Sequence, residues 1–366
     1  MNELRALTSL RGLAALYIVL LHFSSAAQHH ADSTIPALAP RGHLAVDFFF
    51  VLSGFIMAYS YAKDFHQRGL ANAMPSFLLK RFARVMPLHF FMTVTLLLYT
   101  LYVSPTFIGG EAPAFNSATP VRDVVMNLFL LHGLGLAPNM NAPSWSISVE
   151  MFAYLLFPIF LLLVFNRNSL IRWMCTVITV FLLIFTAVQQ PQLGLATSDV
   201  KFTLIRGFTE FILGLVAYRI YSLRTKAIFF GSDKFIFALT GIAGAMMLGR
   251  LWDLVAVFTF PFIILGIAHN RGIVTKLLIH RLPYFLGVIS FSLYLIHSPL
   301  AYLELQTLKY FHPALLTKPI ALLCAATGAL SIIPLAWIVY KAIEFPGREL
   351  IRRAVNRTPY ISTLQL

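Results

Sequence analysis

Ionisable residues occur within several long apolar segments of this 366-residue chain. Such groups are costly in a membrane and are usually retained for function or pairing. Arg11 and His22 lie 11 positions apart in the apolar segment 8–27. At about 100° per residue, this spacing puts both side chains on one helix face, about 16 Å apart along the axis. A neutral imidazole can take a proton from a hydroxyl, so His22 is a candidate general base.

Two carboxylates and a second histidine lie at the same predicted depth as His22. With the topology given below, Asp47, Glu150 and His297 all fall in the outer halves of their apolar segments. A carboxylate beside His22 would orient the imidazole and stabilise its charged form. We expect Glu150 to do this, with Asp47 as the alternative. Asp47 also fits a second interpretation, in which it interacts with the positive end of a helix dipole.

Three arginines have spacings that suggest defined roles. Arg81 and Arg84 are three residues apart, so on a helix they share one face. Guanidinium groups bind phosphate oxygens in a two-pronged geometry, so the pair predicts a phosphate clamp. The alternative is simple anchoring at the cytoplasmic membrane surface. Arg206 lies four residues before Glu210, and we expect these two to pair in a structural role.

The composition identifies the kind of protein that must position these groups. Hydrophobic residues make up 58% and charged residues 11%, whereas soluble domains are about 25% charged. This argues against a soluble enzyme, a disulfide scaffold and a disordered chain, and predicts a multi-pass membrane protein. The only cysteines, Cys175 and Cys324, lie in apolar runs and predict no disulfide framework. The histidines lack zinc-binding spacing, so no metal site is predicted.

Ten apolar runs are about long enough to cross a bilayer as helices. A further run, 124–137, is interrupted by glycines and suits a re-entrant or interfacial segment better. We expect one membrane domain, 1–346, and a short cytoplasmic tail, 347–366. The ten predicted spans are 8–27, 43–61, 85–103, 147–165, 173–189, 203–219, 235–249, 252–268, 284–302 and 319–340.

The basic residues set the predicted topology. With the N-terminus inside and ten alternating spans, 20 of the 28 Lys and Arg residues fall in inside segments and 6 in outside segments. This bias follows the positive-inside rule. It predicts an all-α integral membrane protein of about ten helices with both termini in the cytoplasm. It also accounts for most of the net charge of +14 without a nucleic-acid partner.

Taken in order, these motifs resemble the membrane-bound acyltransferase family 3, which includes polysaccharide O-acetyltransferases. The resemblance covers nearly the whole chain. Its carriers are Arg11 with His22, the stretch 47–55, Arg81 with Arg84, the segments 145–150, 206–214 and 290–299, and the tripeptide 344–346. The resemblance implies transfer of an acyl group, usually acetyl, from cytoplasmic acyl-CoA to a hydroxyl outside, in a multi-pass protein of the bacterial cytoplasmic membrane.

The residues and the resemblance together suggest one mechanism. Arg81 and Arg84 would hold the donor phosphates, and Arg11 would line a pore for the pantetheine arm. His22 would act as the general base. Ser292, Tyr294 and His297 would donate hydrogen bonds to the oxyanion or the acceptor. Acetyl-CoA is then a substrate, and no permanently bound cofactor is expected. A covalent acyl-enzyme remains an alternative to direct transfer.

The sequence leaves the acceptor, the acyl chain length and the oligomeric state open. A surface glycan or lipid-linked sugar is favoured on family frequency, with a small molecule such as a macrolide as the alternative. Some relatives carry an appended extracytoplasmic domain, so we expect either a separate extracytoplasmic partner protein or single-component transfer. A proton-coupled secondary transporter is the main rival, although no internal repeat supports it. A membrane scaffold is a third interpretation.

Overall fold

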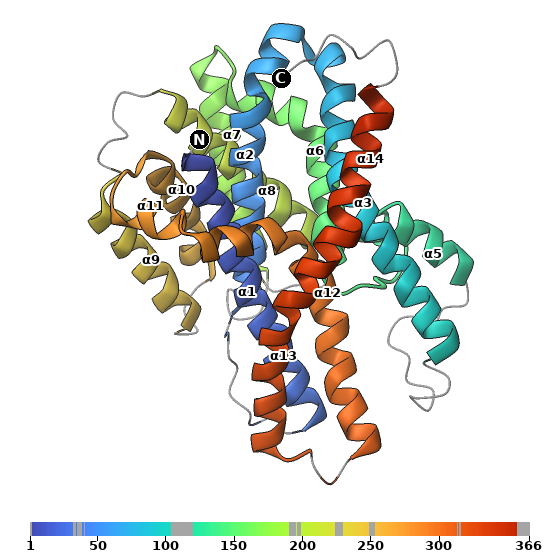
Figure 1. Cartoon of the computed structure of the whole chain (residues 1–366). Coiled ribbons are helices and arrows are strands. Elements are labelled where there is room, and N and C mark those ends of the chain that lie inside the picture. The colour runs from blue at the N-terminus through green and yellow to red at the C-terminus, as the bar shows by residue number, and fades with distance from the viewer. Residues whose placement is uncertain are drawn as a thin grey trace.

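The computed structural model describes residues 2–31, 34, 39, 41–103, 120–189, 195, 199–223, 230–248, 253–312, 314 and 316–356. Within these ranges the chain forms helices and no strand, as predicted (Figure 1). Each predicted span coincides with one long helix. These helices are α1 (Asn2–His30), α2 (Leu44–Arg68), α3 (Leu70–Leu98), α6 (Ser144–Val164), α7 (Ser169–Val188), α8 (Val200–Ser222), α9 (Asp233–Leu248), α10 (Asp253–His269), α12 (Arg281–Phe311) and α13 (Lys318–Val339).

Seven of the helices in the described part of the chain are long and apolar enough to cross a membrane, namely α1, α2, α3, α6, α7, α12 and α13. The other three are less suited by length or charge. Helices α9 and α10 have 16 and 17 residues, and α8 carries Lys201, Arg206, Glu210 and Arg219. An all-α membrane protein is therefore confirmed, whereas the number of ten crossings and the side of each terminus stay predictions.

The long helices pack into two groups around two hydrophobic cores. Helices α1, α12 and α13 pack against one another and form most of the second core. Helix α2 packs closely on α8, which also contacts α6, α7 and α10. In Figure 1 the C-terminal half of α1 extends downward beside α12 and α13, away from the upper ends of α2 and α3. The arrangement leaves α1 and α2 at the junction between the two cores.

Two glycine pairs allow helix backbones to touch at the centre of these groups. A Cβ atom on Gly54 of α2 would collide with the backbone of Phe211 of α8, and one on Gly214 would collide with the backbone of α2. In the same way, a Cβ on Gly12 of α1 would meet the backbone at Gly287 of α12. Small residues let membrane helices approach closely because packing drives their association. These crossings fix the register of α1 on α12 and of α2 on α8.

We expect Gly54→Ala to lower the stability of the folded protein by about 1–3 kcal/mol, because the new methyl group overpacks a backbone contact. The melting temperature of the detergent-purified protein measures this effect. Gly241→Ala in α9 is the matched control, since nothing lies within 4 Å of a Cβ atom there. A Gly54→Ala variant that melts with or above the parent would contradict the predicted crossing.

The predicted re-entrant segment does not form a spanning helix. Helix α5 (Pro120–Leu128) has only nine residues, and Leu130 then adopts a left-handed backbone with φ 59°. A single-turn helix, η2 (His132–Leu134), follows. The side chain of Asn127 ties the segment together, because its amide donates to the carbonyls of Asp123 and Pro138 at 2.8 Å each.

The chain remains helical across the predicted boundary at 346. The π-helical turn η5 (Tyr340–Glu344) joins α13 to α14 (Phe345–Asn356). Helix α14 packs along α3, where Gly347 lies against Pro87. Residues 347–356 of the predicted tail are therefore part of a packed helix, while residues 357–366 lie outside the described ranges. The cytoplasmic position of this tail stays a prediction. The remaining short elements are η1 (Tyr99–Val103), which extends α3, and α11 (Ile273–Leu278).

Candidate active site

A cavity of about 330 Å³ lies where the two hydrophobic cores meet. Its wall combines residues of α1, α2, α3, α6 and α12, and most of the wall is apolar. Five of the nine predicted site residues line it, namely Arg11, Arg81, Arg84, Glu150 and Tyr294. The sequence predictions therefore converge on one cavity formed by five helices.

The three cavity arginines have different partners. Arg11 donates from Nε to Ser290 Oγ at 2.8 Å and from a terminal nitrogen to the Gly287 carbonyl at 3.1 Å. The close crossing of α1 and α12 at Gly287 makes this second contact possible. Arg81 donates to the Tyr61 hydroxyl at 2.9 Å, and its Nε is buried with no hydrogen-bond partner among the residues that the structure describes.

Arg84 forms an ion pair with the buried Glu344 of η5. The other carboxylate oxygen of Glu344 accepts a hydrogen bond from Ser292 Oγ at 2.6 Å. Ser292 is thus bound to Glu344 and is absent from the cavity wall, so the structure does not support its predicted contact with a substrate in the cavity. One partner of the predicted phosphate clamp is already neutralised by a carboxylate from the C-terminal part of the chain.

Glu150 lies in the cavity wall, where its Oε1 accepts hydrogen bonds from Ser53 and Tyr154 at 2.5 Å each. The structure does not bring Glu150 to His22. The expected orientation of His22 by Glu150 is therefore wrong, because the carboxylate is held by α2 and by its own helix. Glu150 instead presents a carboxylate to the same space as Arg11 and Arg81.

His22 contacts His297 in place of a carboxylate. His297 Nε2 lies 3.1 Å from His22 Nδ1, and the ring centroids are 4.7 Å apart. His297 is fully buried, whereas His22 is only half-buried. Neither ring lines the cavity, but Tyr294 does, and its ring centroid is 5.6 Å from that of His297. The Tyr294 hydroxyl is 2.7 Å from Ser146 Oγ, so one turn of α12 separates the cavity from the histidine pair.

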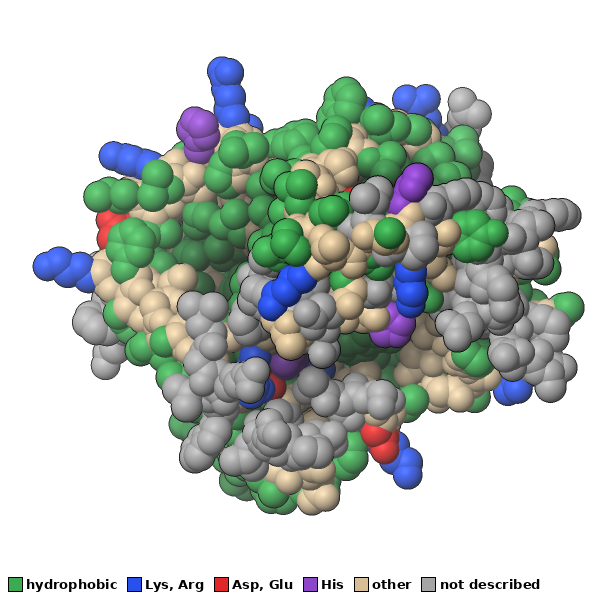
Figure 2. Space-filling model, turned by 90° about the horizontal axis from the view of Figure 1, so that it is seen from below, with side chains coloured by type: hydrophobic (Ala, Val, Ile, Leu, Met, Phe, Trp, Pro, Cys, Tyr) green, Lys and Arg blue, Asp and Glu red, His purple; other side chains and the backbone are tan. Residues whose placement is uncertain are grey.

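In Figure 2, which shows the molecule from below, a few histidine, basic and acidic side chains are visible close together near the middle of the face. This is the face toward which the C-terminal half of α1 and the adjoining ends of α12 and α13 point in Figure 1.

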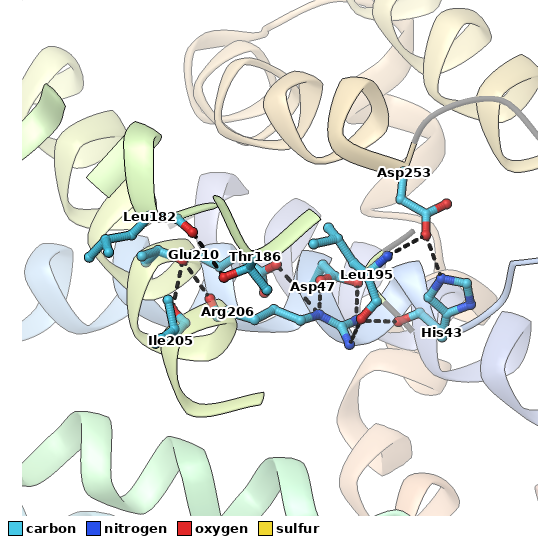
Figure 3. Close-up of polar contacts among 10 residues, drawn as sticks. His43, Asp47, Leu182, Thr186, Leu195, Ile205, Arg206, Glu210 and Asp253 are labelled. Carbon is cyan, nitrogen blue, oxygen red and sulfur yellow. Dashed lines mark hydrogen bonds and ion pairs between the residues drawn. The ribbon is translucent and has the colours of Figure 1, made fainter. Parts of the chain in front are cut away.

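Asp47 belongs to a separate buried cluster and does not line the cavity. Both of its carboxylate oxygens accept hydrogen bonds from Arg206 of α8 (Figure 3). Asp47 is 0% and Arg206 2% exposed. The predicted Arg206–Glu210 pair is present at 3.7 Å, but the closer partner of Arg206 is Asp47. The alternative catalytic role of Asp47 thus loses its geometric basis, because Arg206 occupies the carboxylate.

The cluster extends to a second carboxylate at the start of α10. Arg206 donates to the Leu195 carbonyl at 2.8 Å, and the Leu195 N–H donates to Asp253 at 2.8 Å (Figure 3). Asp253 also contacts His43 Nε2 at 3.0 Å and forms an ion pair with Arg41. These contacts join α2, α8 and α10 through buried polar groups, so the cluster holds helices in place.

Residues 4–341 of the chain match a family described as an acyltransferase domain. The match covers all the helices that form the cavity and the histidine pair. The chain belongs to this acyltransferase family.

Three relatives of this acyltransferase are found among characterised bacterial proteins. It is 31% identical over 179 residues to acyltransferase MdmB of Streptomyces mycarofaciens, across 47% of this chain and 43% of the relative. It is 37% identical over 155 residues to protein 2 in the picA locus of Rhizobium radiobacter, across 40% of this chain and 75% of that relative. It is 24% identical over 161 residues to peptidoglycan O-acetyltransferase OatA of Listeria monocytogenes, across 43% of this chain and 24% of that relative. The matches thus span less than half the length of MdmB and OatA, and no solved structure matches the chain.

Several residues of this candidate site were not predicted from sequence as site residues. Ser53 and Tyr154 hold Glu150, and Ser146 contacts the Tyr294 hydroxyl. Tyr154 lies four residues after Glu150, so helical spacing was a usable signal. Ser53 and Ser146 carried no signal of this kind, because their partners lie on other helices.

Proposed function

We propose that this protein is a membrane-embedded O-acyltransferase that moves an acetyl or other short acyl group from cytoplasmic acyl-CoA to a hydroxyl of an extracytoplasmic glycan. The observation that carries the proposal is the cavity lined by Arg11, Arg81 and Arg84, whose wall also contains Tyr294, a neighbour of His297 in the His22–His297 pair. A donor with phosphates at one end and a thioester at the other matches this distribution of charge.

The donor would bind with its phosphates at the arginines and its uncharged arm in the apolar part of the cavity. Arg81 is the best placed of the three for this role, because its Nε is buried without a partner. Arg84 has a carboxylate partner and Arg11 is bound to α12. The carboxylate of Glu150 offers an acceptor for N–H groups of the donor arm. In this scheme Glu150 has a binding role.

The chemical step would use His22 as the general base. The acceptor hydroxyl oxygen attacks the thioester carbonyl while His22 takes the hydroxyl proton. The carbon–sulfur bond then breaks, and the departing sulfur takes the same proton back from the imidazolium, which gives an ester and free CoA thiol. Tyr294 and Ser146 share one hydrogen bond at the cavity end, so one of the two hydroxyls can donate to the carbonyl oxygen.

The setting of the reaction is also part of the proposal. We place the protein in the cytoplasmic membrane of a bacterium, because its relatives are bacterial and its basic residues follow the positive-inside rule. A glycan or lipid-linked sugar is the acceptor class we favour, since one relative is named a peptidoglycan O-acetyltransferase. A separate extracytoplasmic protein that receives the acyl group is compatible with the scheme.

The test is turnover of the purified protein in liposomes. Acetyl-CoA is supplied as donor and methyl glycosides as acceptors, and free CoA thiol and acetylated sugar are measured together. We expect the two products in equal amounts. A protein that does not bind acetyl-CoA at millimolar concentration, or that carries protons or sugars without acyl transfer, would contradict the proposal.

Arg81→Ala should separate phosphate recognition from chemistry. We expect the KM for acetyl-CoA to rise about 10- to 100-fold, because a charge-assisted contact to phosphate contributes about 1.5–3 kcal/mol. Turnover of S-acetyl-pantetheine, which lacks the nucleotide phosphates, should stay at the parent level. Arg84→Ala is unsuitable for this purpose because it would leave Glu344 buried without its cation. Equal effects of Arg81→Ala on both donors would argue against the clamp.

A further inference from the structure

The hydrogen bonds around the histidine pair determine where its protons lie. His297 Nδ1 is 2.6 Å from the Tyr294 carbonyl oxygen. A carbonyl oxygen can only accept, so His297 Nδ1 carries the hydrogen. In a neutral imidazole the other nitrogen is then an acceptor. His297 Nε2, which faces His22, is therefore unprotonated and presents a lone pair to that ring.

The same reasoning fixes the tautomer of His22. Its Nδ1 lies 3.1 Å from the Ile18 carbonyl oxygen and 3.1 Å from His297 Nε2. Both neighbours are acceptors, so His22 Nδ1 must carry the hydrogen. The remaining nitrogen, His22 Nε2, is unprotonated and makes no hydrogen bond with the described residues. Among the described groups, the contacts thus leave one basic nitrogen of the pair free.

We propose that His297 is a positioning residue that holds His22 in the tautomer with a basic Nε2. This inference rests on the proposed acyl transfer and assigns to His297 the orienting role that a carboxylate has in a hydrolase triad. When Nε2 of His22 takes the acceptor proton, the Nδ1–H becomes a stronger donor to His297 Nε2. The ring of His297 is itself held by the Tyr294 carbonyl, so α12 fixes the whole arrangement.

Burial explains why a neutral partner suits this site. His297 is 0% exposed and lies within α12, one of the helices that are long and apolar enough to cross a membrane. A carboxylate at this place would be an ionised group without a cation before the proton arrives, which is costly in a low-dielectric surrounding. Two neutral imidazoles avoid that cost. His22, which carries the free nitrogen, is the less buried residue of the pair.

Two substitutions test this role in the liposome assay with acetyl-CoA and methyl glycosides. His297→Leu removes the acceptor but keeps an apolar side chain. We expect kcat to fall about 10²- to 10³-fold, because general-base catalysis contributes about 10²- to 10⁴-fold, and KM for acetyl-CoA to stay within about threefold. His297→Gln can place its amide oxygen near the lost Nε2 and should recover kcat to within about tenfold of the parent.

His89→Leu is the matched control. His89 is another buried histidine, held by the Asn127 carbonyl at 2.7 Å, and it neither lines the cavity nor belongs to the His22–His297 pair. Its replacement should lower the melting temperature without changing kcat by more than about twofold, as for independent sites. A role of His297 in packing alone predicts the same pattern for His297→Leu.

The outcomes separate this inference from the proposed function. Loss of kcat in His297→Leu with recovery in His297→Gln supports the positioning role. Unchanged kcat in His297→Leu, or equal losses in both variants, would overturn it. If His22→Ala abolishes turnover while His297→Leu does not, the base stands and only the role of His297 fails. If His22→Ala retains full turnover, the proposed base itself is wrong.

Discussion

His22→Ala is expected to lower kcat by about 10²- to 10⁴-fold, because it removes the group that takes the proton from the acceptor hydroxyl. Binding of acetyl-CoA should persist, since the cavity that contains Arg11, Arg81 and Arg84 does not include His22. Equilibrium binding of acetyl-CoA and the rate of thiol release, measured on the same preparation, distinguish these two effects.

His66→Ala is the control for this experiment. His66 is an exposed histidine in the last turn of α2, so its removal should leave kcat and donor binding at the parent level. If His22→Ala turns over acetyl-CoA at the parent rate, His22 is not the base. If donor binding and stability are lost together, His22 acts in packing.

Asp47→Ala is expected to cost about 3–5 kcal/mol of folding free energy, because it removes the closer of the two carboxylates that pair with the buried Arg206 guanidinium. The amount of folded protein in the membrane and the melting temperature should both fall sharply. Activity per folded molecule should change far less. This result would assign Asp47 to the architecture, in line with its ion pair to Arg206.

Asp64→Ala provides the comparison for Asp47→Ala. Asp64 pairs with Arg68 in α2, but both side chains are about 30% exposed. Exposed pairs contribute about 0–1 kcal/mol, so this variant should melt close to the parent. An Asp47→Ala protein that melts normally but has lost turnover would restore the catalytic role considered from the sequence.

Much of the secondary structure was predictable because a membrane imposes strong rules on sequence. All ten apolar runs correspond to helices, since backbone groups in hydrocarbon must bond within their own segment. The short and broken structure of 124–137 also followed from its glycines and length. Length and charge do not identify α8, α9 and α10 as membrane-crossing helices. Helices α9 and α10 are short, and buried charges such as Arg206 lower the hydropathy of α8.

The site was predictable where one helix carried the information. Arg11 and His22 share α1, and the helical period placed them on one face. Partners on different helices were not predictable, because the period of one helix says nothing about its rotation against another. Asp47 was therefore assigned to the site although it faces α8, and Glu150 was assigned to His22 although Ser53 and Tyr154 hold it. Arg84 and Glu344, 260 positions apart, are a further example.

The Gly12–Gly287 contact has a consequence for how far a donor must reach. At this crossing α1 presents Arg11 to Ser290, and about three helical turns further along it presents His22 to His297. Both pairs depend on the same register of the same two helices, so a shift of one helix along the other would break them together. The two helices thus hold the backbone positions of Arg11 and His22 about 16 Å apart along α1. In the proposed reaction, a donor arm that runs from Arg11 to His22 would have to span that separation.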